Sequence, residues 1–485
     1  MEDKFHDECA VVGVINHAEA SKYSYLALYA MQHRGQEGAG IVSTDGQFMY
    51  THRDMGLVAD VFSDTSLHEL HGTAAIGHTR YATAGSKDWL NLQPLVANFA
   101  NNSFAIAHNG NLVNAAELRA DLESKGSIFS TTSDTEDILH LVARADAELS
   151  IQGRLLSALE DVEGAYSLVV LSLGRLIAAR DPSGVRPLSL GRIGEGYVVA
   201  SETCAFDLIG AEFIRDIEPG EVLEISREGE MKSCFLKKKR PAAFCVFEYV
   251  YFARPDTNLF GRNVYGVRKR LGAELALEHP VDADLVIPVP DSGVPAALGY
   301  AQQTGIPMEF GLIRNHYIGR TFIEPKQSIR DFGVKIKLNP NARLIEGKRV
   351  VLVDDSIVRG TTCRKIVKML RAAGAKEVHF RISSPPTIGP CHYGIDTPSR
   401  EELVAAQLSV TEICNYIKAD SLGYLSVEGM FRAVGASRDA HCDACFTGDY
   451  KLGEIPASCG GSCVKQASDT AGKNKGLIKV SLNKA

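Results

Sequence analysis

The apolar segments of this 485-residue chain change their pattern near residue 240. Before that point they are short runs separated by turns, at 10–15, 38–43, 74–79, 103–110, 166–173, 174–181 and 196–202. A few segments there, notably 23–34 and 135–150, have the apolar spacing of a helix. Many short strands with few helices predict stacked β-sheets with helices packed outside them.

The second half of the chain alternates strands with helices instead. Its strand-like stretches lie within 281–293, 308–313, 349–362 and 377–386, and helix patterns at 296–305 and 364–375 separate them. This alternation predicts βαβ units and a parallel sheet, whose ligands bind beyond the carboxyl ends of the strands. The basic stretch KKKRPAAF at 237–244 separates the two patterns and is expected to be a linker with solvated charges.

Composition excludes several classes of function. The formal net charge is -7, which gives no basic surplus for binding nucleic acid. No apolar stretch is long enough to span a bilayer, and the leader MEDKFHDE lacks the apolar core of a secretory signal. The 11 cysteines then favour a reducing, cytoplasmic environment, where cysteines are more often free, catalytic or metal-bound than bridged. We therefore expect neither nucleic acid nor membrane among the partners.

Two acids and an RGTT turn follow the buried run Val350–Val353. Asp354 and Asp355 cannot bind phosphate, but carboxylates suit ribose hydroxyls or a hard cation. Glycine permits close backbone approach, and threonine hydroxyls, helix N-terminal amides and an arginine bind phosphate. If only the strand and the acid pair are considered, an ordinary α/β turn with solvated acids is the alternative. The RGTT sequence that follows argues against this alternative.

The stretch VVLVDDSIVRGTT resembles the signature of type I phosphoribosyltransferases, which bind 5-phosphoribosyl-1-pyrophosphate (PRPP). The resemblance implies that two aspartates hold the ribose hydroxyls and Mg²⁺, that the following turn binds the 5′-phosphate, and that the loop PVPDSG meets the pyrophosphate. The implied PRPP-binding residues are Asp291, Ser292, Gly293, Asp354, Asp355, Ser356, Arg359, Gly360, Thr361 and Thr362. One Mg²⁺ per subunit would be held by Ser292, Asp354 and Asp355. The basic segment 314–330 resembles the mobile lid of this family, and a basic surface loop is the alternative.

Four motifs in the first half closely resemble class II glutamine amidotransferases: QHRGQEGAGI at 32–41, GHTRYAT at 77–83, AHNGNL at 107–112 and TTSDTE at 131–136. The resemblance implies an α+β N-terminal-nucleophile fold of four αββα layers. In that family the nucleophile is the first residue of the mature chain. Cleavage after Glu8 would therefore remove residues 1–8 as a propeptide and make Cys9 the new N-terminus.

The chemistry of a terminal cysteine fits this implication. A thiol is nucleophilic as thiolate and has a free pKa of about 8.5, whereas a free α-amine has a pKa of about 7.7–8.0 and can act as the adjacent base. By the same resemblance, Asn109 and the backbone N–H of Gly110 form the oxyanion hole for attack by Cys9. The implied glutamine-binding residues are Arg34, Arg80, Tyr81 and Asp134. Arg80 suits the α-carboxylate of glutamine and Asp134 suits its ammonium, with the other two in support.

Together the two modules resemble the amidophosphoribosyltransferase family from Cys9 to about Tyr450. The resemblance implies transfer of ammonia from glutamine to C1 of PRPP, the first step of de novo purine (IMP) biosynthesis. It also implies feedback inhibition by purine nucleotides and a homotetramer. The expected domains are a propeptide at 1–8, an amidotransferase domain at 9–236, a linker at 237–257, a phosphoribosyltransferase domain with an α/β parallel sheet and a C-terminal helical region at 258–460, and a mobile tail at 461–485.

The remaining cysteines include a C-x-x-C pair, Cys442 and Cys445, which suits zinc, iron or redox chemistry. Further ligands must come from distant positions, and the candidates are Cys245, Cys391, Cys414, Cys459 and Cys463. The stretches FCVFEYVYFARPD, PCHYGID and CDACFTG resemble the leader-containing family members that carry one 4Fe–4S cluster per subunit. That resemblance nominates Cys245, Cys391, Cys442 and Cys445. The pair Cys459 and Cys463 is a rival set, and structural thiols are the other alternative.

Two other functions are consistent with part of the sequence. One is a different class II amidotransferase, such as a sugar-phosphate aminating enzyme or an asparagine synthetase, and the PRPP signature argues against it. The other is a non-catalytic sensor of PRPP or nucleotides, and the presence of Cys9, Asn109 and Asp134 argues against that.

Overall fold

A computed structural model describes residues 9–81, 89–99, 102–315 and 338–453. The contacts divide the chain into two compact units. Of the described residues, the first unit comprises 9–244, His392–Asp396 and 450–453, and the second comprises Cys245–Cys391 and Thr397–Asp449. The division after Phe244 falls within the range predicted for the linker. We call the first the amidotransferase unit and the second the phosphoribosyl unit.

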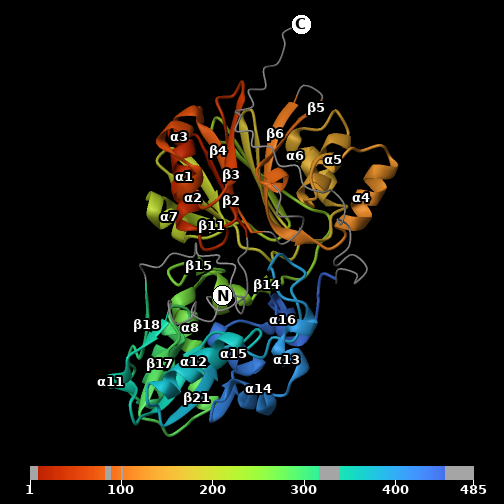
Figure 1. Ribbon diagram of the computed structural model, residues 1–485. Coiled ribbons are helices and arrows are strands. Elements are labelled where there is room, and N and C mark those ends of the chain that lie inside the picture. The colour runs from red at the N-terminus through yellow and green to blue at the C-terminus, as the bar shows by residue number, and fades with distance from the viewer. Residues whose placement is uncertain (1–8, 82–88, 100–101, 316–337, 454–485) are drawn as a thin grey trace, which may run out of the picture. The chain divides into compact units, whose positions relative to one another are not determined.

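Two antiparallel sheets form the centre of the amidotransferase unit (Figure 1). In spatial order, the seven-stranded sheet contains β11 (Glu212–Asp216), β9 (Ser189–Ile193), β10 (Gly196–Ala200), β1 (Ala10–Ile15), β4 (Ala74–Arg80), β2 (Gly38–Thr44) and β3 (Met49–Met55). The six-stranded sheet contains β13 (Met231–Phe235), β12 (Glu221–Ser226), β8 (Arg175–Arg180), β7 (Gly164–Ser172), β6 (Asn102–Leu112) and β5 (Leu95–Phe99).

Helices cover the outer face of each sheet. Those of the seven-stranded sheet are α1 (Ala20–Ala30), α2 (Val58–Val61), α3 (Asp64–Glu69) and α7 (Cys204–Ile209). Those of the six-stranded sheet are α4 (Ala115–Ser124), α5 (Thr135–Arg144) and α6 (Ile151–Leu159). The predicted αββα sandwich is therefore confirmed. The helices predicted at 23–34 and 135–150 correspond to α1 and α5, which end several residues earlier, at Ala30 and Arg144.

The alternation of side chains along β1 explains the layers. Val12 and Val14 pack with Leu28 and the other helix residues on one face, whereas Val11 and Ile15 pack against the second sheet. Because successive side chains of a strand point to opposite faces, a continuous apolar strand is stable only between two apolar layers. The run AVVGVI therefore belongs in the interior of such a sandwich, and all six of its residues are buried.

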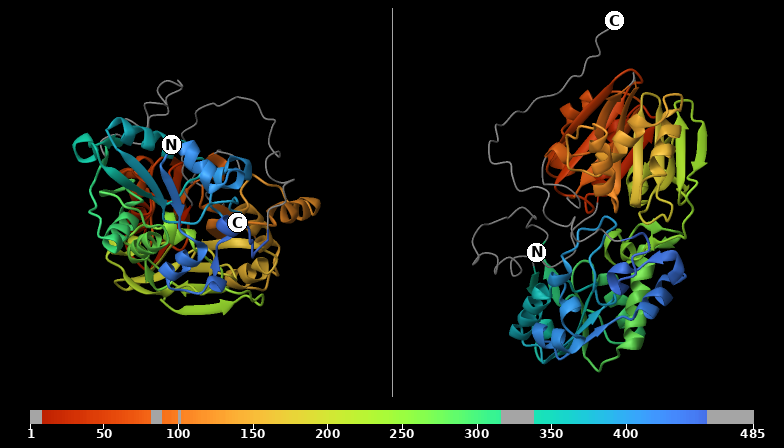
Figure 2. Two further views of the ribbon diagram at one scale, coloured as in Figure 1. Left: turned by 90° about the horizontal axis from the view of Figure 1, so that it is seen from below. Right: turned by 90° about the vertical axis from the view of Figure 1, so that its right-hand side faces the viewer.

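The phosphoribosyl unit has a parallel sheet in the order β17 (Leu285–Pro288), β20 (Arg349–Asp354), β21 (Glu377–Ile382) and β22 (Ser421–Tyr424). Its helices include α8 (Val264–Glu278), α9 (Val294–Thr304), α12 (Thr361–Ala372), α13 (Val404–Gln407), α14 (Val410–Ile417) and α15 (Val427–Val434), with short helices α11 (Ala342–Ile345) and α16 (Ala444–Thr447) (Figure 2). The parallel sheet predicted from the strand–helix alternation is confirmed.

Two local expectations differ from the structure. The apolar run 308–313 does not add a long strand to the parallel sheet, because its last residues form β18 (Leu312–Arg314), which pairs with β19 (Leu338–Pro340). The basic stretch 237–244 is not simply solvated, since Lys238 and Arg240 both form ion pairs with Glu163. None of the helices in the described ranges combines the length and the apolar character that crossing a bilayer requires.

Candidate active site

Cys9 lies directly before β1 in the amidotransferase unit, and its residue is only 8% exposed. Strand β1 pairs with β4 so that Ala10 lies opposite Thr79, which brings the end of β4 beside the cysteine. The thiol donates to the carbonyl oxygen of Tyr81 at 3.5 Å. The sheet thus brings together three residues that the sequence predicted for one site, namely Cys9, Arg80 and Tyr81. The predicted propeptide, residues 1–8, lies outside the described residues.

Arg34 reaches the same cysteine from the turn after α1. Its Nε donates to the carbonyl oxygen of Cys9 at 3.4 Å, and its NH1 donates to Glu202 at 2.5 Å. Glu202 is fully buried and also contacts Nε2 of His33 at 2.7 Å. A buried carboxylate needs such partners. Glu202 follows β10, and no motif in the sequence indicated that it would support Arg34.

Asn109 and Gly110 lie on β6, opposite Ser167 and Tyr166 of β7. The side chain of Asn109 is completely buried, and neither atom of its amide has a hydrogen-bond partner among the described residues. Gly110 has φ +147, and a Cβ there would lie 2.0 Å from the carbonyl oxygen of Ala165. Only glycine fits that position. An unpartnered buried amide is costly unless a ligand completes it, as an oxyanion would.

His78 and His108 connect the two sheets next to this site. Nε2 of His78 donates to the carbonyl oxygen of His108 at 3.1 Å, which ties β4 to β6. Burial lowers the pKa of His78 to about 3, with a further contribution from the positive charge of Arg80. A neutral His78 therefore links the strand that carries Arg80 to the strand that carries Asn109.

Asp134 lies at the N-terminus of α5, close to the end of β6. Its Oδ2 accepts a hydrogen bond from the backbone N–H of Leu112 at 3.0 Å, and its Oδ1 lies 3.5 Å from Nδ1 of His108. Burial opposes ionisation, but attraction to His108 and hydrogen bonds from His108, Leu112 and Thr135 lower the pKa of Asp134 overall. The residue is a buried carboxylate near Asn109, with the charge that an ammonium ligand requires.

The predicted PRPP residues follow β17 and β20, which are neighbours in the parallel sheet. The backbone N–H of Val289 donates to the carbonyl oxygen of Val353 at 2.8 Å, so the loops after these strands begin at the same edge. A Cβ on Gly293 would lie 2.5 Å from that same oxygen, which explains the glycine before α9. The sheet therefore brings Asp291–Gly293 and Asp354–Thr362 together.

Asp354 and Asp355 are 2% and 1% exposed. Asp354 accepts a hydrogen bond from the backbone N–H of Asp355 at 2.9 Å, and Asp355 accepts one from the hydroxyl of Ser356 at 2.5 Å. These bonds orient two carboxylates at the end of a strand. Oxygen ligands of this kind suit a hard cation or hydroxyl groups.

The predicted phosphate turn lies at the start of α12. Gly360 has φ +76 and precedes the first helical residue, Thr361, so the helix N-terminus faces the turn. Arg359 forms an ion pair with Glu402 at 2.9 Å. In the other loop Asp291 is paired with Arg314, the first residue of the predicted lid. Residues 316–337, which include most of that lid, lie outside the described residues.

Backbone hydrogen bonds bring together the segments that carry the four nominated cysteines of the phosphoribosyl unit. Val246 N–H donates to the carbonyl oxygen of Cys442 at 3.1 Å, and the N–H groups of Ile388 and Gly389 donate to that of Cys445 at 2.9 and 3.1 Å. Burial, with the charges of the other three thiols, raises the pKa of Cys445.

In the ranges that the structure describes, no three His, Cys, Asp or Glu side chains form a group that could hold a metal ion. The electrostatic interaction of Cys445 with Cys245, Cys391 and Cys442 nevertheless shows that the four nominated thiols lie near one another. Cys459 and Cys463, the rival pair, lie outside the described residues.

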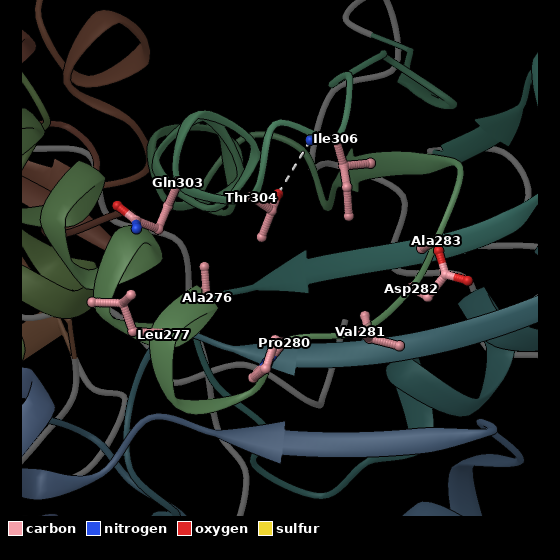
Figure 3. Close-up of a pocket in the computed structure, with 9 residues that line it drawn as sticks. All are labelled: Ala276, Leu277, Pro280, Val281, Asp282, Ala283, Gln303, Thr304 and Ile306. Atoms are coloured by element: carbon pink, nitrogen blue, oxygen red, sulfur yellow. Dashed lines mark hydrogen bonds between the residues drawn. The ribbon is translucent and has the colours of Figure 1, made fainter.

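A cavity of about 500 Å³ in the phosphoribosyl unit lies away from the predicted PRPP-binding residues (Figure 3). It is lined by the end of α8, residues 280–283 and the end of α9. These segments lie at the amino edge of the parallel sheet, because β17 begins only at Leu285. The acid pair follows the opposite, carboxyl edge. We therefore assign the candidate sites from the converging polar groups and not from this cavity.

Comparisons with known proteins agree with both units. The model of a glutamine amidotransferase domain matches residues 78–207, and the model of a phosphoribosyl transferase domain matches residues 267–383. Amidophosphoribosyltransferase 2, chloroplastic, of Arabidopsis thaliana is 54% identical over 453 residues, which cover 93% of this chain and 80% of that protein. The amidophosphoribosyltransferase of Bacillus subtilis (strain 168) is 52% identical over 450 residues, which cover 92% of this chain and 94% of that protein.

A solved structure is similar to this chain along both units. Glutamine phosphoribosylpyrophosphate (PRPP) amidotransferase from B. subtilis, complexed with ADP and GMP, matches with a TM-score of 0.88 and 50% sequence identity. The match covers 93% of this chain and 98% of that chain. The similarity therefore includes both units and their order along the chain.

Proposed function

Because this chain belongs to the amidophosphoribosyltransferase family, we propose that it converts PRPP, glutamine and water into 5-phosphoribosylamine, glutamate and pyrophosphate. The observation that carries the proposal is the match along both units, from the amidotransferase domain to the phosphoribosyl transferase domain. A related solved structure is described as the allosteric regulatory enzyme of purine biosynthesis. We accordingly place the reaction at the start of purine (IMP) biosynthesis.

The first half-reaction takes nitrogen from glutamine. With residues 1–8 removed, the free amine of Cys9 accepts the thiol proton, and the sulfur attacks the side-chain amide carbon. The Asn109 amide and the N–H of Gly110 donate to the oxyanion that forms. The proton returns to the leaving nitrogen, so ammonia departs and a thioester remains. Water then hydrolyses the thioester to glutamate and restores the thiol.

The remaining residues of this site bind glutamine. The guanidinium of Arg80 pairs with the α-carboxylate, and the carboxylate of Asp134 pairs with the ammonium. Tyr81 accepts the thiol hydrogen bond through its backbone, which holds the sulfur beside the pocket. Arg34 holds the carbonyl group of Cys9, which orients the nucleophile. The support for these roles is that all of these residues lie around the start of β1, the end of β4 and the second half of β6.

The second half-reaction takes place in the phosphoribosyl unit. Ammonia attacks C1 of PRPP and pyrophosphate leaves, and the newly attached nitrogen then loses a proton to give the amine. Asp354 and Asp355 hold the ribose hydroxyls, residues from Ser356 to Thr362 bind the 5′-phosphate, and Asp291–Gly293 bind the pyrophosphate. For the phosphate to reach Arg359, the ion pair of this arginine with Glu402 must open.

The chemistry of the donor set fits one Mg²⁺ per subunit, held by Ser292, Asp354 and Asp355. Both carboxylates are buried at the strand end, where a hard cation would neutralise them. When bound, Mg²⁺ stabilises the negative charge of the departing pyrophosphate. The test is Mg²⁺ titration of PRPP binding with wild type and Asp355→Asn, which should weaken the metal dependence.

We also propose one structural 4Fe–4S cluster per subunit, held by Cys245, Cys391, Cys442 and Cys445. The adjacent backbone segments support it, as does the raised pKa of Cys445, because crowded thiolates need a compensating cation. Anaerobically purified protein should be brown and contain about four iron and four sulfide per chain. Cys442→Ser should lower the iron content, whereas Cys234→Ser, on β13, should not. Colourless wild-type protein that contains zinc would contradict the proposal.

Further properties follow from the family. Purine nucleotides would inhibit the enzyme, in line with the ADP and GMP in the related B. subtilis structure. We also propose a homotetramer and a cytoplasmic location, although several relatives are chloroplastic proteins. Assays with GMP and ADP test the inhibition, and the mass measured by light scattering tests the tetramer. Cell fractionation tests the location.

The main experiment measures glutamate and pyrophosphate together. Wild-type protein given glutamine, PRPP and Mg²⁺ should release them in equal amounts. Glutamate formation without pyrophosphate, or pyrophosphate formation only with free ammonia, would contradict the coupled reaction. N-terminal sequencing of the same protein should begin at Cys9.

A further inference from the structure

A five-residue segment from the second half of the chain belongs to the amidotransferase unit. His392–Asp396 has its contacts with that unit, whereas its neighbours Cys391 and Thr397 belong to the phosphoribosyl unit. We call this segment the strap. The chain therefore leaves one unit, contributes these five residues to the other, and returns. No motif in the first half of the sequence indicates such a contribution.

Buried donors hold the strap at two successive carbonyl groups. Nδ2 of Asn111 donates to the carbonyl oxygen of His392 at 3.1 Å, and Nε of Arg186 donates to that of Tyr393 at 2.8 Å. Asn111 is 8% exposed and Arg186 is fully buried. Charged or buried donors of this kind fix a backbone more firmly than solvent-exposed ones.

The side chain of Tyr393 provides a further anchor. It is 1% exposed, its hydroxyl donates to the carbonyl oxygen of Gly453 at 2.9 Å, and the same hydroxyl accepts from the N–H of Leu452 at 3.0 Å. Both contacts lie inside the amidotransferase unit. The strap is therefore a fixed part of that unit and not a loosely attached loop.

Gly394 of the strap touches the backbone of Gly110. A Cβ on Gly394 would lie 2.8 Å from Cα and 2.9 Å from the carbonyl carbon of Gly110, with no side chain between them that could give way. Gly110 in turn has no room for a Cβ, because Ala165 of β7 is too close. The peptide of Gly110 is thus in close contact with both β7 and the strap.

We propose that the strap positions the N–H of Gly110 for the oxyanion of the glutaminase reaction. This inference rests on the proposed function, which assigns that N–H to the oxyanion hole. A donor acts well only where its direction matches the charge that develops in the transition state. Because the strap contacts the backbone of Gly110, which carries the oxyanion donor, we expect it to act on the rate of the chemical step and not on substrate binding.

Gly394→Ala tests the strap directly, since the added methyl group must displace Gly110. The glutaminase kcat should fall by about 100-fold, as on loss of one oxyanion donor, with the KM for glutamine changed less than about threefold. Inhibition by the γ-aldehyde analogue of glutamine, which forms a tetrahedral adduct with the thiol, should weaken by a similar factor. Ammonia-dependent formation of phosphoribosylamine should stay at the wild-type rate.

Gly229→Ala is the matched control. Gly229 also has a positive φ, +85, but its Cβ would meet nothing closer than 3.9 Å. This variant carries a comparable backbone strain without the contact, so its glutaminase kcat should be close to wild type. If Gly394→Ala loses ammonia-dependent activity as well, Asn111→Ala is the second test, because it removes a hydrogen bond to the strap. We expect this variant to lower the glutaminase kcat by about tenfold and to leave the ammonia-dependent rate unchanged.

The outcomes separate the two hypotheses. A wild-type protein without glutaminase activity would contradict the proposed function. An active wild type with Gly394→Ala as active as Gly229→Ala would overturn the role of the strap. The role is equally overturned if KM rises while kcat is unchanged, or if Asn111→Ala lowers the glutamine- and ammonia-dependent rates by the same factor.

Discussion

Cys9 directly precedes the buried strand β1 and Asp354 is the last residue of the buried strand β20, but the residues around them come from very different distances along the chain. The PRPP site is formed by two strand–loop–helix units of neighbouring parallel strands. The glutaminase site is formed by the start of β1, the end of β4, the middle of β6, the N-terminus of α5 and residues after β10. One site is therefore local, and the other is assembled by the whole sandwich.

This difference determines where substitutions act. In the local site, the turn that binds a ligand also begins its own helix, so a substitution changes mainly the group that it removes. In the assembled site, buried residues such as Glu202 and His78 hold the strands that carry the catalytic groups. Substitutions that never contact glutamine should therefore change its hydrolysis.

The largest effect is expected from Asp354→Asn combined with Asp355→Asn. Loss of both buried carboxylates removes the ribose and Mg²⁺ ligands, so phosphoribosylamine formation should fall by about 1,000-fold or more with either glutamine or ammonia. Glutaminase activity measured without PRPP should remain. A comparable loss of glutaminase activity would show that the two sites are not separable.

Asn109→Ala should act on the other half-reaction alone. Removal of one oxyanion donor is expected to lower the glutaminase kcat by about 100- to 1,000-fold, with a small change in KM. Ammonia-dependent activity is the internal control and should be unchanged. A variant that changes KM but not kcat would place Asn109 in substrate binding instead.

The pH dependence of stability tests the connection between the sheets. The folded pKa of His78 is about 3, below its unfolded value of about 6.5. Protonation therefore favours the unfolded state, so its contribution is complete above pH 6.5 and is lost as the pH falls toward 3. Lowering the pH from 7.5 to 5 should cost about 2 kcal/mol through this residue.

His78→Gln should reduce that pH-dependent loss, measured as the change in the urea midpoint of the amidotransferase unit between the two pH values. His68→Gln is the control, because His68 is exposed on α3. Equal loss of stability in wild type and His78→Gln would contradict the assignment.

The smallest effect is expected from Glu202→Gln. The amide keeps the shape but loses the charge that orients Arg34, so the glutaminase kcat should fall by about tenfold through a misplaced Cys9. Glu212→Gln on the exposed edge strand β11 should have no effect. If both variants behave alike, Glu202 does not position the nucleophile.

The sequence allowed prediction of the local features better than the assembled ones. The stacked sheets of one half, the parallel sheet of the other and the strands before Asp354 and Arg80 followed from apolar patterns, because a buried strand needs a continuous or alternating apolar run. The αββα arrangement was implied by the family resemblance. The acid pair and the RGTT turn were recognisable because their ligand contacts lie within a few consecutive residues. Residues that are close in sequence are necessarily close in space, so their arrangement can be inferred without knowing the rest of the fold.

Other features could not be predicted because they depend on contacts between distant segments. Glu202, which holds Arg34, has no sequence motif of its own, and the ion pair of Arg359 with Glu402 joins residues from separate loops. The strap at His392–Asp396 lies in the half of the sequence that otherwise forms the phosphoribosyl unit. Pairing between such segments becomes visible only in three dimensions.

The most direct test of the two separate sites is Cys9→Ala, assayed in parallel with glutamine and with ammonia as the nitrogen source. We expect no phosphoribosylamine from glutamine and a rate close to wild type from ammonia, because the nucleophile serves only the first half-reaction. Undiminished formation from glutamine would contradict the assignment of Cys9. Equal loss with both nitrogen sources would contradict the separation of the two sites.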